Sequence, residues 1–114
     1  MDLKEFYSVI GGDYDGVMSR LITEERVKKF VRKFVGDLSF SDLMAALEKS
    51  DVKAAFLAAH TLKGVSQNLG FDSLYRKSSA IYEILRAGSP DVGALPTEIK
   101  LQYTTIIDAL GSLE

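Results

Sequence analysis

The 114-residue sequence contains no cysteine, a single histidine and only two prolines. Without cysteine there can be no disulfide bond, no thiolate catalysis and no cysteine-based metal site. This absence fits a reducing compartment without requiring one. The sequence also has no charged and then apolar leader, and no run of about 18 apolar residues. We therefore expect a cytoplasmic protein that is neither exported nor embedded in a membrane.

A large net charge and a phosphate-binding loop are missing as well. The chain has 14 Lys and Arg against 16 Asp and Glu, a net charge of −2, whereas nucleic-acid binding usually requires a basic surface. Gly11, Gly12 and Gly64 do not form a P-loop, because none of them leads into the Gly-Lys-Ser/Thr of that motif. We expect neither a nucleic-acid partner nor an ATP site.

The pattern that is present is typical of an all-α protein. Apolar residues make up 46% of the chain; they recur at spacings of three and four, with no strand-like alternation. The length suits a single domain, residues 1–114, with a proper core. Short turns between long helices indicate antiparallel neighbours and hence an up-and-down four-helix bundle. Within residues 39–114, the expected bundle helices are 40–49, 52–69, 73–87 and 96–110.

Residues 1–38 are expected to form shorter helices that pack on the bundle as a cap. Helices over 2–10 and 13–21 are too short to be stable alone, and a third begins at Thr23. The apolar stripe of this third helix is Val27, Phe30, Val31, Phe34 and Leu38. Its other face, Lys28, Lys29, Arg32 and Lys33, is either a solvated surface or a site for an acidic partner. Which of these early helices belong to the bundle stays open.

Helix ends are indicated by residues that satisfy free backbone groups. The expected N-terminal caps are Asp13, Thr23, the pair Ser50 and Asp51, a capping box of Ser39 and Asp42, and either Asp72 or Ser73. Gly70 is suited to a left-handed C-terminal end, with Phe71 closing over it.

The stretch from Asp51 to Gly70 places the only histidine, His60, on the outward face of a helix. At about 100° per residue, the far side of this helix is an apolar stripe that can lie on a core. The stripe consists of Val52, Ala55, Ala58, Ala59, Leu62, Val65 and Leu69. Five residues lie within about 60° of His60: Phe56, Leu57, Lys63, Gly64 and Gln67. No carboxylate occurs between Asp51 and Asp72, so this face is suited to carrying an anion and contacting another protein.

The run AHTLKGVSQNLG, with His60, Lys63, Gly64, Ser66 and Gly70, resembles the signature of the histidine-containing phosphotransfer (HPt) domain family. The resemblance implies a phosphorelay intermediate in two-component signal transduction. Its expected partners are receiver domains of response regulators and hybrid histidine kinases. In that family the phosphoryl group passes between a receiver aspartate and the histidine, most often through the distal ring nitrogen.

The residue types around His60 suit this chemistry. A neutral imidazole has a lone pair that can attack an activated phosphoryl group. The product gains about two negative charges, which Lys63, one turn further on, can stabilise. Gln67 is either an amide donor to the same group or an ordinary surface amide. Gly64 leaves room for a phosphoryl group and a partner loop.

Several catalytic classes are excluded around His60. No second histidine or acidic cluster accompanies it, so neither a catalytic triad nor a metal site can be assembled there. We therefore expect a phosphocarrier with no cofactor and no kinase activity of its own, and Mg²⁺ supplied by the partner receiver domain.

Three further side chains are expected to contribute to partner binding. Phe56 and Leu57 form an apolar docking patch, unless the N-terminal cap covers them. Pairing the helices about Gly70 puts residues 80–82 level with His60, where Tyr82 is the polar candidate to reach the imidazole or its phosphorylated form. The alternative function is a non-catalytic helical adaptor that binds signalling proteins through the same face without phosphorylation. In either case we expect a monomer.

Overall fold

The computed structural model describes all 114 residues and contains helices but no strands. The elements are α1 (Leu3–Val9), α2 (Tyr14–Leu21), α3 (Glu24–Lys33), the 3₁₀ segment η1 (Phe34–Gly36), α4 (Ser39–Glu48), α5 (Val52–Asn68), α6 (Asp72–Arg86) and α7 (Leu95–Gly111). The prediction of an all-α fold is confirmed.

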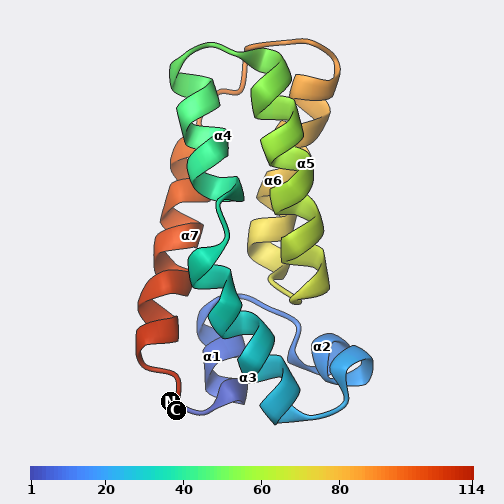
Figure 1. The fold of residues 1–114 in the computed structure, drawn as a ribbon, viewed down its shortest axis with the longest axis vertical. Helices are drawn as coiled ribbons and strands as arrows, with labels where there is room; N and C mark the ends of the chain where they lie inside the picture. Colours follow the sequence, from blue (N-terminus) through green and yellow to red (C-terminus); the bar gives the residue numbers. More distant parts are fainter.

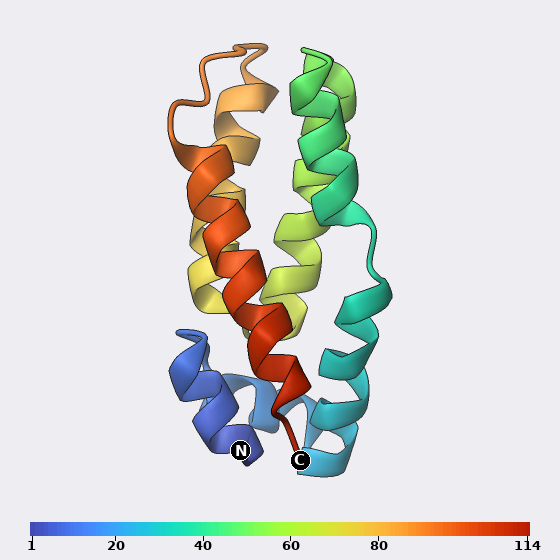
Figure 2. The same cartoon turned by 90° about the vertical axis from the view of Figure 1, so that its left-hand side faces the viewer.

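Helices α4 to α7 lie side by side as an antiparallel four-helix bundle, and α1 to α3 gather at one end of it (Figure 1). Helix α5 packs between α4 and α6. Helix α7 is long enough to run from the bundle down to α1 (Figure 2). Helix α3 and η1 lie below α4, on the same side of the molecule (Figure 2). The chain ends meet, since the Met1 amino group donates to the Ser112 carbonyl at 2.7 Å.

The core joins the bundle to the N-terminal helices. Leu43, Leu62, Ile81 and Ile106, one from each bundle helix, are completely buried. At the junction with the cap, the rings of Phe6, Tyr7 and Phe34 surround that of Phe71, with centroids 5.2 to 6.2 Å from it. The short helices therefore gain their stability from tertiary packing, as their length requires.

Most helix ends lie where local sequence predicts them. The side chains of Asp13, Thr23 and Asp51 accept hydrogen bonds from the backbone N–H three residues further on, at 3.0, 3.2 and 3.0 Å. Gly70 adopts φ +70°, and the N–H of Phe71 donates to the Ser66 carbonyl at 2.9 Å. This is the left-handed helix end with its hydrophobic closure.

Two caps were predicted wrongly. Ser39 is the first residue of α4 rather than its cap, and the Asp37 carboxylate accepts from its N–H at 2.9 Å and from its hydroxyl. Helix α6 has no side-chain cap, because neither Asp72 nor Ser73 makes that bond. The Ser73 hydroxyl instead donates to the Gly11 carbonyl at 3.3 Å and links α6 to the cap.

The expected stripe of the third helix was also too broad. Val27, Val31 and Phe34 are buried, but Phe30 is 41% and Leu38 67% exposed. Helix α3 ends at Lys33, and η1 and Asp37 change the chain direction, so Leu38 no longer follows the helical period. Phe30 lies at the margin of the stripe, where it lines an open hollow together with Val65 and Leu69 and is only partly covered.

Candidate functional site

Helix α5 is seated on the core by small and aliphatic residues and presents His60 to solvent. Ala59 and Leu62 are completely buried, while His60 is exposed, so the helix orientation agrees with the helical-wheel prediction. Ser66 is buried and its hydroxyl donates to the Leu62 carbonyl at 2.7 Å. It is therefore a packing residue, as its inward position in the sequence indicates.

Tyr82 of α6 lies beside the imidazole, at the level predicted from the α5–α6 hairpin. The ring centroids of His60 and Tyr82 are 5.6 Å apart, with planes inclined at 38°. Tyr82 is half-buried. One edge of the imidazole is thus bordered by an aromatic ring from the neighbouring helix.

The Lys63 ammonium lies over the same tyrosine. Its Nζ is 4.4 Å from the centroid of the Tyr82 ring. The only ion pairs in the structure join the Met1 amino group to Glu114 and Arg86 to Glu83. Lys63 therefore has no carboxylate partner and lies one helical turn from His60.

Open space adjoins the imidazole at Gly64. A Cβ atom built on this glycine would meet no heavy atom within 4 Å. No packing constraint in the domain therefore requires glycine at this position, and a bulky group can approach His60 over it.

The two apolar residues of the expected docking patch have different surroundings. Phe56 is half-buried and stacks against Tyr82, with centroids 5.2 Å apart and planes inclined at 24°. Leu57 is 57% exposed. The alternative that the N-terminal cap covers them is wrong, because α1 to α3 lie at the other end of α5 (Figure 1). Phe56 is instead partly covered by α6.

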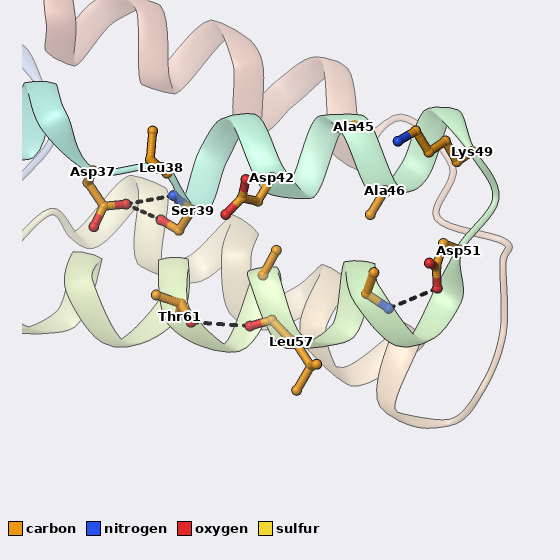
Figure 3. Close-up of a pocket in the computed structure, with 12 residues that line it drawn as sticks. Asp37, Leu38, Ser39, Asp42, Ala45, Ala46, Lys49, Asp51, Leu57 and Thr61 are labelled. Atoms are coloured by element: carbon orange, nitrogen blue, oxygen red, sulfur yellow. Dashed lines mark hydrogen bonds between the residues drawn. The ribbon is translucent and has the colours of Figure 1, made fainter.

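Beyond Leu57, an open groove of about 560 Å³ runs along the surface between α4 and α5 (Figure 3). Leu57 and Thr61 line it from α5, and Asp42 and Ala45 from α4. The solvent face that begins at His60 therefore continues across α5 onto α4. Helical periodicity within one element could not reveal this groove, because it depends on which helix lies next to α5.

Gln67 is separate from the group around Tyr82. It is exposed and lies about 10 Å further along the helix axis than His60. Its backbone carbonyl and that of Asn68 accept hydrogen bonds from Arg20 of α2, both at 3.2 Å. No pattern in the sequence indicated Arg20, which is distant in the chain and reaches α5 only through the packing of the cap.

Metal-binding and membrane-spanning features are not found in this fold. No group of three or more histidine, aspartate or glutamate side chains is arranged to hold a metal ion. None of the helices is both long and apolar enough to cross a membrane.

The family comparison agrees with this geometry. The model of the Hpt domain matches residues 37–112, which include all four bundle helices and His60. The chain therefore belongs to the Hpt domain family, whose members are phosphocarrier modules of two-component signalling and not kinases. Neither the curated proteins nor the solved structures gave a significant match.

Proposed function

We propose that the protein is a phosphorelay intermediate in which His60 accepts a phosphoryl group from a receiver-domain aspartate and passes it to another receiver. The observation that carries this proposal is the setting of the only histidine. It is exposed on a bundle helix, with an unpaired lysine on one side and open space over Gly64 on the other.

The proposed step exchanges one bond to phosphorus for another. The lone pair of an imidazole nitrogen attacks phosphorus, and the bond between phosphorus and the aspartyl oxygen breaks. The carboxylate leaves with the electron pair, and the second ring nitrogen can release its proton to water. Lys63, one helical turn from His60, would stabilise the phosphoryl charge that arrives on the imidazole. The reverse step delivers the group to the next aspartate.

The partner would supply what this domain lacks. Receiver domains, alone or within hybrid histidine kinases, are the proposed partners, and their Mg²⁺ would neutralise charge during transfer. Leu57, Phe56 and Tyr82 form one edge of the proposed contact surface. The exposed Leu57 side chain gives this part of the contact surface an apolar group to bury against the partner. A monomeric, cytoplasmic protein remains a prediction.

A transfer assay tests the function directly. The protein is incubated with a receiver carrying labelled aspartyl phosphate, and the label on the protein is followed. We expect label that is stable in alkali and labile in acid, which distinguishes phosphohistidine from aspartyl phosphate. His60→Gln should abolish the label while the circular dichroism spectrum stays helical.

The same assay separates the carrier from the adaptor. Binding of receivers without any transfer would favour the adaptor. Equal labelling of wild type and His60→Gln would overturn the assignment of the acceptor residue.

A further inference from the structure

The Lys63 ammonium of this site is held by an aromatic ring. Lys63 is not paired with a carboxylate; its Nζ lies 4.4 Å from the centre of the Tyr82 ring. The same ring lies 5.6 Å from the imidazole of His60 and 5.2 Å from Phe56. A single side chain of α6 therefore contacts three side chains of α5, each on the face that carries His60.

We infer that Tyr82 is a positioning residue: its aromatic face holds the Lys63 ammonium beside His60, ready to meet the incoming phosphoryl group. This inference rests on the proposed function, because it takes His60 as the phosphoryl acceptor. It assigns Tyr82 a role within the domain itself, distinct from a contact with the partner.

The first argument concerns competition for the cation. A lysine paired with a carboxylate would have to break that pair before it could bind a phosphoryl group. A cation over an aromatic ring at an exposed site is held only weakly. A hydrogen bond between two charged groups is stronger. The ammonium can therefore transfer from the ring to the phosphoryl oxygens.

The second argument concerns order. A lysine side chain has four rotatable bonds and is among the side chains that lose most conformational entropy when they are fixed. The ring of Tyr82 already restricts Lys63 to the side of α5 that faces α6. Stacking against Phe56, with planes inclined at 24°, in turn restrains the tyrosine ring. Lys63 therefore loses part of its conformational entropy before the phosphoryl group arrives.

The ring rather than the hydroxyl is the group that acts. No hydrogen bond is made by the Tyr82 hydroxyl to any side chain or backbone atom. Tyr82→Phe is therefore the matched control, since it keeps the aromatic face. Tyr82→Leu removes that face while keeping an apolar side chain.

The test uses the isolated protein without a receiver, with His60 phosphorylated chemically by phosphoramidate. The pKa of the phosphoryl group is then measured by a ³¹P NMR titration. A nearby cation favours the dianion and lowers this pKa. We expect Tyr82→Leu to raise it by about half a unit, toward the value of Lys63→Met, and Tyr82→Phe to leave it unchanged.

The outcomes are distinct. An unchanged phosphoryl pKa in Tyr82→Leu, when Lys63→Met does raise it, overturns the inference. A fall in receiver affinity as the only effect of Tyr82→Leu would show a docking residue and overturn it too. Because no receiver takes part in the titration, a failure of relay activity does not affect this result.

A second measurement needs no substitution. The ring current of Tyr82 should shift the terminal methylene protons of Lys63 upfield of those of Lys53, an exposed lysine on the same helix. Unshifted Lys63 protons in the unphosphorylated wild type would overturn the inference. On phosphorylation these protons should move toward ordinary values, because the ammonium leaves the ring for the phosphoryl oxygens.

Discussion

Gly64 is a residue that packing within the domain does not explain. A glycine in the middle of a helix costs about 1 kcal/mol relative to alanine. A Cβ here would contact nothing within 4 Å, so packing within the domain offers no compensation. The proposed function supplies a reason for glycine, since a phosphoryl group and a partner loop would approach His60 over this position.

Two substitutions of Gly64 separate its effect on stability from its effect on phosphoryl transfer. Gly64→Ala should raise the free energy of unfolding by about 1 kcal/mol, measured by urea denaturation. Gly64→Gln should leave the fold intact but slow transfer from a phosphorylated receiver by about tenfold or more, because its side chain occupies the approach to His60. A normal transfer rate in Gly64→Gln would refute the access argument.

Lys63 should act through its charge. Lys63→Ala is expected to slow transfer by about tenfold, because a charged hydrogen bond worth about 1.5 kcal/mol is lost from the phosphorylated state. The helix content should stay the same. Lys53→Ala, at an exposed position on the same helix, is the control and should transfer normally. Equal rates for the two variants would exclude a specific role for Lys63.

Ser78 presents a different problem at the residue scale. It is completely buried on α6, and its hydroxyl has no hydrogen-bond partner. Ser78→Ala should therefore stabilise the protein by about 1 kcal/mol in urea denaturation. Ser66→Ala is the contrast, because that hydroxyl is bonded to the Leu62 carbonyl. If both substitutions were equally destabilising, the Ser78 hydroxyl would have to form a hydrogen bond in solution.

At the scale of the element, the C-terminal end of α5 depends on the N-terminal helices. Tyr7 of α1 donates to the Leu69 carbonyl at 2.5 Å, and Arg20 of α2 donates to the carbonyls of Gln67 and Asn68. These bonds add donors to carbonyls at the end of the helix, where the regular intrahelical bonds stop, and the guanidinium complements the negative end of the helix dipole. The cap therefore fixes one end of the helix that carries His60.

Arg20→Ala tests this dependence. We expect a loss of about 1 kcal/mol in stability and faster hydrogen exchange in the last turn of α5. Receiver-dependent labelling of His60 should be nearly unchanged, because His60 lies about two turns away. Arg26→Ala, an exposed arginine on α3, is the control. If Arg20→Ala made hydrogen exchange faster only in α3, the proposed support of α5 by Arg20 would be contradicted.

At the scale of the whole molecule, the junction between cap and bundle should set the stability at high pH. Burial raises the pKa of Tyr7 well above its usual value, with the nearby Arg20 opposing this shift. Above the unfolded pKa of about 10, the unfolded chain releases this proton while the native protein keeps it. Stability should therefore fall as pH rises through and beyond 10, by up to about 1.4 kcal/mol per pH unit from this group.

Denaturation between pH 8 and pH 11 checks this prediction. Tyr7→Phe should be less stable at pH 8, because it loses the bond to Leu69, but its stability should decline less between the two pH values. Tyr14 is a useful comparison, since its pKa is raised mainly by a hydrogen bond to Glu24 at an exposed site. Parallel pH curves for wild type and Tyr7→Phe would rule out Tyr7 as the cause.

The sequence predicted features that depend on residues close together in the chain. Asp13, Thr23 and Asp51 cap helices because their partners are three residues away. The period of α5 likewise determined that Ala59 faces inward and His60 outward. Local steric and hydrogen-bonding rules are sufficient in these cases, so the bundle helices and the exposed histidine follow from the sequence by itself.

Tertiary packing decided what depends on neighbours distant in the chain. It left Phe30 and Leu38 exposed. It also brought Arg20 to the carbonyls at the end of α5 and placed Lys63 over the Tyr82 ring. The helical period gives the direction of a side chain but not the identity of the element it meets. That identity follows from how whole helices fill the core together, and it determines which groups surround His60.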